Sequence, residues 1–374
     1  MIRDNSAISP VVASIEAENL SVVLGGQRII DIPSFRVFPN EVLAIIGPNG
    51  SGKTTLLLAL AALLKPEKDN CISYWGQPVK YGSDILRLRR QFAVLFQDPL
   101  LLSGNAWNNV TLGLRMRGVK KEEINLRTKK WMERFGIVGL AKRQVKTLSG
   151  GEAKRVSLAR AFVLQPEILF LDEPFAALDS PTRAALLEDF ESVLRETRVT
   201  TVMVTHESNE AIVLANRVAI LMKGRLRQVG TPKEVFSCPV DEEVADFIEV
   251  GNIIHGIVVS QNAGLASVAV NGINIDVVSG LAPGTDVIMF LRHEDITLSL
   301  LSEHVMQSSA RNQLPGKVVK VFPTGSQIRI TLDCGFPLVS IITTRSYEEM
   351  GLAPGKDVIS TFKATAVRLI IKTK

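Results

Sequence analysis

Cysteine is scarce in this sequence of 374 residues: Cys71, Cys238 and Cys334 lie far apart and match no metal-binding spacing. This usage fits free thiols in a reducing compartment. Long apolar runs are also missing, because the longest, Leu56–Leu64, has about half the length that crosses a bilayer. Residues 1–10 are polar and lack the apolar core of a secretion signal. We therefore expect a protein that is soluble by itself and meets a membrane only through a partner.

An excess of charge of one sign is missing as well. The formal net charge of +5 is modest for this length and the basic residues are spread out, so the charge predicts no nucleic-acid partner. The chain does have the length for two or three domains, and its hydrophobic fraction of 46% is enough for packed cores.

The most informative feature that is present is residues 47–54, a full match to the phosphate-binding loop G-x-x-x-x-G-K-[ST]. Its glycines let the backbone wrap so that N–H groups point at an anion. Lys53 adds a charge for the outer phosphates, and the Thr54 hydroxyl can ligate magnesium. The apolar run Val42–Ile46 predicts a buried strand before the loop, and Thr54–Leu64 predicts a helix after it. The alternative is a simple glycine turn between a strand and a helix.

A second apolar strand, Ile168–Leu171, is followed by the carboxylates Asp172 and Glu173. Asp172 can hold magnesium through water, and Glu173 can deprotonate an attacking water. The alternative is that the pair only caps the following helix.

The segment Leu148–Glu152 places two glycines before a run of good helix formers. It predicts a second helix N-terminus that attracts anions. Two such helix ends, far apart in one chain, make sense if each completes the nucleotide site of a different subunit.

Along the chain, strand-like and helix-like segments alternate over the first ~245 residues, which predicts helices packed on a largely parallel sheet. Further strand candidates are Phe92–Phe96, Thr201–Thr205 and Val218–Met222, and residues 101–144 predict a helical insertion. After about Val250, short β-type runs broken by glycine and proline predict a small β-barrel or sandwich. The similar turns at 281–284 and 352–355 hint at an internal repeat.

Together these motifs resemble the ATP-binding subunit of an ATP-binding-cassette (ABC) transporter over residues 14–246, with a helical subdomain at about 98–160. The resemblance implies an α/β nucleotide-binding fold, ATP and Mg2+ as cofactors, and ATP hydrolysis in a sandwich dimer of two such subunits. Glu173 matches the general base, His206 the switch histidine and Gln97 the glutamine that contacts magnesium and senses the membrane partner. Leu24 stands where an aromatic ring usually stacks on adenine, so base selectivity could be relaxed.

The resemblance assigns three further groups of residues. Contacts to ATP are assigned to Gly47, Pro48, Asn49, Gly50, Ser51, Gly52, Lys53, Thr54, Thr55 and Asp172. Magnesium is assigned to Thr54, Gln97 and Asp172. Contacts to the ATP of the opposite subunit are assigned to Ser149, Gly150, Gly151, Asp179 and Glu152, which replaces the more usual glutamine.

The β-rich part, residues 250–374, resembles the accessory domains of ABC importers, and residues ~307–372 resemble molbindin-like domains. The elements that carry the second resemblance are Ser309–Asn312, Gly316–Val319, Ile342–Ser346, Leu352–Gly355 and Phe362–Thr365. A tetrahedral oxyanion needs hydroxyl and amide donors with one cation, which Ser309, Lys363 and Thr365 could supply. The alternative is that these residues serve turns and surface solvation.

We therefore expect the ATPase subunit of an importer at the cytoplasmic face of the inner membrane, attached peripherally. Its expected partners are a second copy, two membrane permease subunits and, indirectly, an external solute-binding protein. The expected cargo is tungstate or molybdate. Importers of iron, sulfate, sugar or polyamine remain an alternative, as does an ABC-type ATPase that has an oxyanion-sensing domain and no permease.

Overall fold

The computed structural model describes residues 12–82, 85–248, 251–300 and 309–372, so residues 1–10 lie outside it. The chain forms two compact units, Met1–Val235 and Phe236–Lys374, a division that falls upstream of residue 246. In the ranges that the structure describes, no helix combines the length and the apolar character needed to span a bilayer.

A six-stranded sheet in the order β10-β9-β3-β8-β7-β6 forms the centre of the first unit. All neighbours are parallel except the β9–β10 pair. Every residue of β3, β7 and β8 is buried, which explains why the sequence shows continuous apolar runs there. The predicted strands are confirmed as β3 (Val42–Ile46), β6 (Phe92–Leu95), β7 (Ile168–Asp172), β8 (Thr200–Val204) and β9 (Arg217–Met222), with β10 at Arg225–Gly230.

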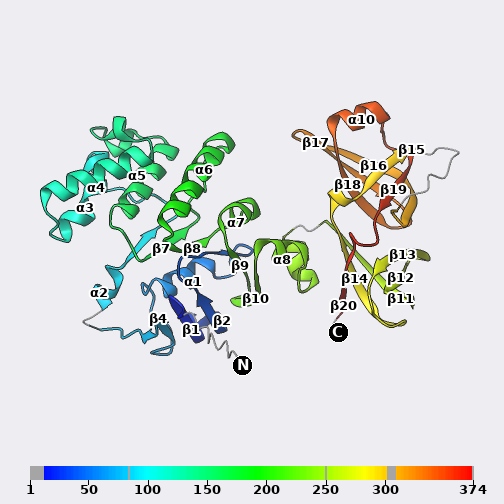
Figure 1. Cartoon of the computed structure of the whole chain (residues 1–374), viewed down its shortest axis with the longest axis horizontal. Helices are drawn as coiled ribbons and strands as arrows, with labels where there is room; N and C mark the ends of the chain where they lie inside the picture. Colours follow the sequence, from blue (N-terminus) through cyan, green and yellow to red (C-terminus); the bar gives the residue numbers. More distant parts are fainter. Residues whose placement is uncertain (1–11, 83–84, 249–250, 301–308, 373–374) are drawn as a thin grey trace, which may run out of the picture. The chain divides into compact units, whose positions relative to one another are not determined.

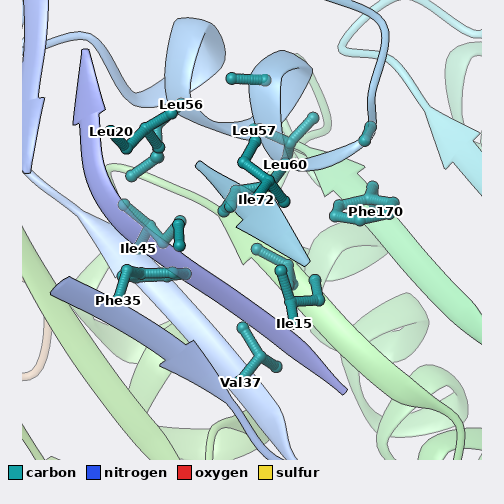
Figure 2. Close-up of a cluster of buried hydrophobic side chains, with 14 of the residues drawn as sticks. Ile15, Leu20, Phe35, Val37, Ile45, Leu56, Leu57, Leu60, Ile72 and Phe170 are labelled. Carbon is teal, nitrogen blue, oxygen red and sulfur yellow. The ribbon is translucent and has the colours of Figure 1, made fainter. Parts of the chain in front are cut away.

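A second, antiparallel sheet in the order β2-β1-β4-β5 was not expected from the sequence. Its strands are β1 (Ile15–Leu24), β2 (Gln27–Val37), β4 (Ile72–Tyr74) and β5 (Gln77–Pro78). One core joins this sheet, helix α1 (Lys53–Leu60) and the parallel sheet. Figure 2 shows its side chains, among them Ile15, Leu20, Phe35, Val37, Ile45, Leu56, Leu57, Leu60, Ile72 and Phe170.

Helix α1 ends at Leu60, so the prediction of a helix through Leu64 was wrong. Ala62 adopts a left-handed φ of 55°, and the N–H groups of Leu63 and Leu64 both turn back to the carbonyl of Leu58. The Arg89 guanidinium also donates to the Ala62 carbonyl at 2.7 Å. These contacts stop the helix although residues 61–64 are all good helix formers.

The predicted helical insertion between β6 and β7 is confirmed. Helices α3, α4 and α5 lie side by side (Figure 1) and bury a cluster of Trp131, Phe135 and Phe162. Besides α1, the helices of the first unit are α2 (Ile85–Arg89), α3 (Ala106–Met116), α4 (Lys121–Arg134), α5 (Gly150–Phe162), α6 (Ser180–Thr197) and α7 (Ser208–Leu214), with short 3-10 turns at Val138–Leu140 and Val145–Thr147. Helix α8 (Pro232–Ser237) crosses the division between the units.

The second unit holds two five-stranded antiparallel sheets, β13-β12-β11-β14-β20 and β15-β19-β16-β17-β18, around one apolar core. Its strands are β11 (Asn252–Asn262), β12 (Leu265–Val270), β13 (Ile273–Val278), β14 (Asp286–Leu291), β15 (Thr297–Leu300), β16 (Asn312–Thr324), β17 (Gln327–Asp333), β18 (Pro337–Thr343), β19 (Asp357–Phe362) and β20 (Arg368–Ile371). Its helices are α9 (Glu242–Phe247) and α10 (Thr344–Met350), with a 3-10 turn at His293–Asp295.

The two sheets are built alike, which supports the internal repeat that the turns suggested. Strands β11 to β14 correspond to β16 to β19, and the fifth strands are exchanged, since β20 completes the first sheet and β15 the second. In both repeats the N–H group of the turn glycine donates to an equivalent strand residue. Gly284 donates to the carbonyl of Val258 and Gly355 to that of Val318, each at 2.7 Å. Because each half supplies a strand to the other, neither half completes its sheet alone.

Candidate functional site

The phosphate-binding loop connects buried β3 to α1, and its backbone conformation leaves N–H groups available to an anion. Gly52, the residue before the first turn of α1, has a φ of 97°, which favours glycine, and no side chain caps the helix. The buried hydroxyl of Ser51 has no hydrogen-bond partner among the described residues. Uncapped N–H groups and an unpartnered hydroxyl are the donors that a phosphate chain needs.

Lys53 is the cation of this loop, and it is only 7% exposed. Its ammonium donates to the carbonyls of Gly47 at 2.8 Å and Pro48 at 3.1 Å, so it folds over its own loop. Burial lowers the pKa of Lys53, and the charges of Glu173 and Asp172 oppose that shift. Phosphate oxygens at this position would supply the negative charge that a buried ammonium needs.

Thr54 and Asp172 meet at the position that the sequence assigns to magnesium. The Thr54 hydroxyl donates to Oδ1 of Asp172 at 3.2 Å, which brings the end of β7 beside the start of α1. Asp172 is 6% exposed; burial raises its pKa, and the hydrogen bond from Thr54 lowers it. A hydroxyl and a carboxylate this close fit a small hard cation, which prefers oxygen ligands.

Glu173 and His206 face each other across the ends of β7 and β8. Nδ1 of His206 lies 3.1 Å from Oε1 of Glu173, within hydrogen-bond distance. The Glu173 side chain is largely buried, whereas that of His206 is about half exposed. The histidine therefore can hold the carboxylate from the open side of the site, where a nucleotide would enter.

Gln97 follows β6, and its carbonyl accepts a hydrogen bond from the ammonium of Lys154 on α5. The same ammonium reaches the carbonyl of Glu173 at 3.5 Å. Sequence reasoning missed Lys154, because it treated residues 152–161 only as good helix formers. A signal was present, since Lys154 stands at helical spacing with Leu158 and Ala161, which are buried.

Four more residues, to which the sequence analysis gave no role in a site, surround Glu173 and His206. Arg183 pairs with Glu207 at 2.7 Å, and the Thr205 hydroxyl donates to the buried Glu210 at 2.5 Å. With Glu173 and His206 these side chains line a cavity of about 60 Å³. The Nε of Arg183 is buried without a partner among the described residues, which a water in this cavity would satisfy.

The segment at the start of α5, Leu148–Glu152, is closed by its own side chains. The Ser149 N–H donates to Glu152 at 2.8 Å, and the Glu152 N–H donates to the Ser149 hydroxyl at 3.3 Å, which forms a capping box. Arg143 pairs with Glu152 at 2.8 Å. The hydrogen bond from the Ser149 backbone and the charge of Arg143 hold the pKa of Glu152 below its ordinary value.

This segment lies beside the loop that begins α6. A Cβ added to Gly151 would stand 2.7 Å from the Thr182 methyl group, so this close approach requires glycine. Asp179 caps α6 by accepting from the Thr182 N–H at 3.0 Å. Within the described part of the chain, no hydrogen bond or ion pair joins residues 149–152 or Asp179 to the loop at 47–55 of the same subunit.

Four other residues named from the sequence are exposed. Leu24 ends β1 at the hairpin with β2 and is 44% exposed. In the second unit, Asn312 of β16 pairs with Phe362 of β19, so that Ser309, which precedes β16, and Lys363 and Thr365, which follow β19, lie beyond the same end of this strand pair. All three residues are exposed, and no hydrogen bond among the described residues links them to one another.

Comparison with known proteins gives consistent results for both units. Residues 30–176 match the family model for the ABC transporter, and residues 308–369 match that for the TOBE domain. The chain is 36% identical to the molybdate/tungstate import ATP-binding protein of Pyrococcus abyssi, over 90% of this chain and 94% of that protein. It is 30% identical to the sulfate/thiosulfate import ATP-binding protein of Thermosynechococcus vestitus, over 92% and 95% of the two.

One solved structure is also similar. It is cbiO1 from Clostridium perfringens, described as part of the ABC transporter complex cbiONQ. The TM-score is 0.57 at 30% sequence identity, and the match covers 60% of this chain and 91% of that chain.

Proposed function

Because this chain belongs to the ATP-binding subunits of ABC importers, we propose that its ATP hydrolysis drives the uptake of an oxyanion, molybdate or tungstate. Membership rests on the relatives and the family models, which confirm the ATPase activity and the fold class expected from the sequence. The observation that carries the chemistry is the meeting of Lys53, Thr54, Asp172, Glu173 and His206 at the ends of β3, β7 and β8.

In the proposed reaction, the residues of this chain divide the work between binding and proton transfer. Lys53 and the N–H groups before α1 bind the phosphates, and Glu173 takes a proton from the attacking water while His206 orients its carboxylate. Thr54, Asp172 and Gln97 would hold magnesium, which when bound neutralises phosphate charge. Loss of turnover on chelation, with recovery on adding Mg2+, tests the metal assignment.

We propose that two copies form a nucleotide sandwich in which Ser149–Glu152 and Asp179 meet the ATP of the partner. The separation of these residues from the loop of their own subunit supports this arrangement, because they have no role there. ATP would then join the copies, and hydrolysis would separate them. Sedimentation of the full chain with and without ATP tests this proposal, since a monomer in both conditions would contradict it.

A permease partner is proposed for the helical part of the first unit. Leu100, Leu102 and Met116 are all more than half exposed there, close in sequence to Gln97. Exposed apolar side chains of this size are typical of a binding surface. Replacing Leu102 by Asp should uncouple uptake from ATP hydrolysis and leave hydrolysis by the free subunit unchanged.

The oxyanion cargo is supported by three relatives named for molybdate/tungstate import, two of which match 90% of this chain, and by the TOBE match in the second unit. Ser309, Lys363 and Thr365 lie at one end of the β16–β19 pair, where two hydroxyls and an ammonium could serve one anion. Relatives named for iron and polyamine import match 65% and 66% of this chain, and the one named for sulfate/thiosulfate import matches 92% of it, so cargo has to be tested directly.

The deciding experiment measures uptake of molybdate, tungstate, sulfate and iron by mass spectrometry in cells that lack this gene. The natural sequence should restore uptake of molybdate or tungstate, and Glu173→Gln should not. Restored uptake of sulfate alone would overturn the choice of molybdate or tungstate and keep an oxyanion importer, and restored uptake of iron alone would overturn the oxyanion proposal and keep the importer. Lys363→Ala in the same cells tests the second unit. If Lys363 belongs to a ligand site there, this variant should change how uptake depends on the concentration of molybdate inside the cell.

A further inference from the structure

Lys154 is a buried cation that no motif accounts for. It lies in the second turn of α5 and is 3% exposed. Its ammonium leaves the helix and donates to two backbone carbonyls on other elements, that of Gln97 after β6 and that of Glu173 after β7. A buried lysine is rare unless its charge is matched, so its presence requires a physical explanation.

The carbonyl of Glu173 belongs to a residue in a strained conformation. Its φ of 44° lies in the left-handed region, which is unfavourable for a residue with a Cβ. The Glu173 N–H is held by the Val204 carbonyl at 2.9 Å. The Glu173 carbonyl accepts from the Ala176 N–H at 3.2 Å and from Lys154 at 3.5 Å. Lys154 is thus one of three contacts that hold this backbone in place.

The charges around Lys154 explain how it stays buried. Burial lowers its pKa, and the carboxylates of Asp98, Asp172, Glu173 and Glu210 oppose the shift. Two of these carboxylates belong to the proposed catalytic cluster. The ammonium therefore sits behind the site, where its charge attracts the carboxylates and its hydrogen bonds hold the backbone that carries one of them.

We propose that Lys154 is a positioning residue that ties the Glu173 backbone and the Gln97 segment to helix α5. This role of Lys154 rests on the proposed role of Glu173 as the base. The N-terminus of α5, one turn before Lys154, is the part proposed to meet the ATP of the partner. When the ATP of the partner contacts the N-terminus of α5, a shift of this helix moves the backbone of Glu173 in the same subunit. Each of the two ATP sites of the dimer then responds to the other.

The test compares Lys154→Met, which keeps the length and removes the donor, with Lys154→Arg in the full chain. We expect Lys154→Met to lower kcat about 10- to 100-fold, to leave the affinity for ATP within about twofold, and to abolish the positive cooperativity of hydrolysis in ATP. Lys154→Arg should recover part of kcat and of the cooperativity. A kcat of Lys154→Met within twofold of the natural protein would overturn the proposal.

Arg160 offers a matched control on the same helix. It is also a cation that donates to backbone carbonyls, those of Pro99 at 2.7 Å and Leu100 at 2.8 Å, and it makes no hydrogen bond to Glu173 in the described part of the chain. Arg160→Met should lower the melting temperature as much as Lys154→Met does, without the same loss of kcat. Equal losses of kcat in both variants would show a purely structural role and overturn the proposal.

Glu173→Gln separates this proposal from the proposed base. If Glu173→Gln still turns over ATP, the role of Glu173 fails and the argument for Lys154 fails with it. If Glu173→Gln is inactive while Lys154→Met is fully active and cooperative, only the role of Lys154 fails. Should Lys154→Met fold poorly, Lys154→Gln keeps one hydrogen-bond donor without the charge and serves in the same measurements.

Discussion

The N-termini of α1 and α5 both carry glycines and both attract anions, yet they differ in what occupies them. The end of α1 has no side-chain cap and has a buried hydroxyl without a partner and a buried cation, Lys53. The end of α5 is exposed and closed by the Ser149–Glu152 capping box. The first thus keeps a buried donor without a partner among the described residues, whereas the N–H groups of Ser149 and Glu152 at the second are already engaged by the capping box.

The largest effect is expected for Glu173→Gln, which leaves both helix ends intact and removes the base. We expect kcat to fall about 1000-fold while ATP still binds and holds two copies together. Hydrolysis assays and sedimentation with ATP measure the two properties. Glu167→Gln is the control, because Glu167 precedes the opposite end of β7. Normal steady-state turnover in Glu173→Gln would contradict the assignment of the base.

The second-largest effect is expected for a change at the N-terminus of α1 alone. Lys53→Met removes the buried cation and should weaken ATP binding on the order of 100-fold, because phosphate charge would be buried without its partner. Equilibrium binding of a fluorescent ATP analogue measures this change. Lys65→Met, which breaks the exposed Lys65–Asp69 pair at 3.1 Å, should bind ATP normally. Similar affinity in Lys53→Met and Lys65→Met would refute the difference drawn between the two helix ends.

The smallest effect is expected at the α5 end. Glu152→Gln keeps an oxygen for the capping box and removes the charge that repels the partner's phosphates. It should therefore strengthen ATP-dependent dimerisation about two- to fivefold. Glu152→Ala removes both the charge and the capping box, and it serves as the contrasting variant. Weaker dimerisation by Glu152→Gln would mean that the carboxylate is not repulsive there.

The pH dependence of stability tests the same Ser149–Glu152 capping box. The pKa of Glu152 is lowered in the folded chain, so its contribution is present above the unfolded pKa and is lost as pH falls through the folded pKa. Between about pH 5 and about pH 3, the melting temperature should fall less in Glu152→Gln than in the natural sequence. Parallel curves would show that the box does not depend on charge.

Much of the first unit could be predicted because local signals agree there. The buried strands β3, β7 and β8 are continuous apolar runs, and the loop before α1 is a contiguous motif. The antiparallel sheet was missed, since β1 and β2 alternate buried and exposed residues only over part of their length. The end of α1 was misplaced because a distant guanidinium, Arg89, helps to stop the helix.

The sequence by itself determined the ligand, since the motif at 47–54 and the carboxylates after β7 depend on neighbours in the chain. Only the tertiary structure decided which residues act together. The strained backbone of Glu173, the reach of Lys154 to two carbonyls, and the exchanged fifth strands of the second unit all join segments far apart in the sequence. Such contacts depend on packing and on closing long loops, for which the local sequence carries no signal.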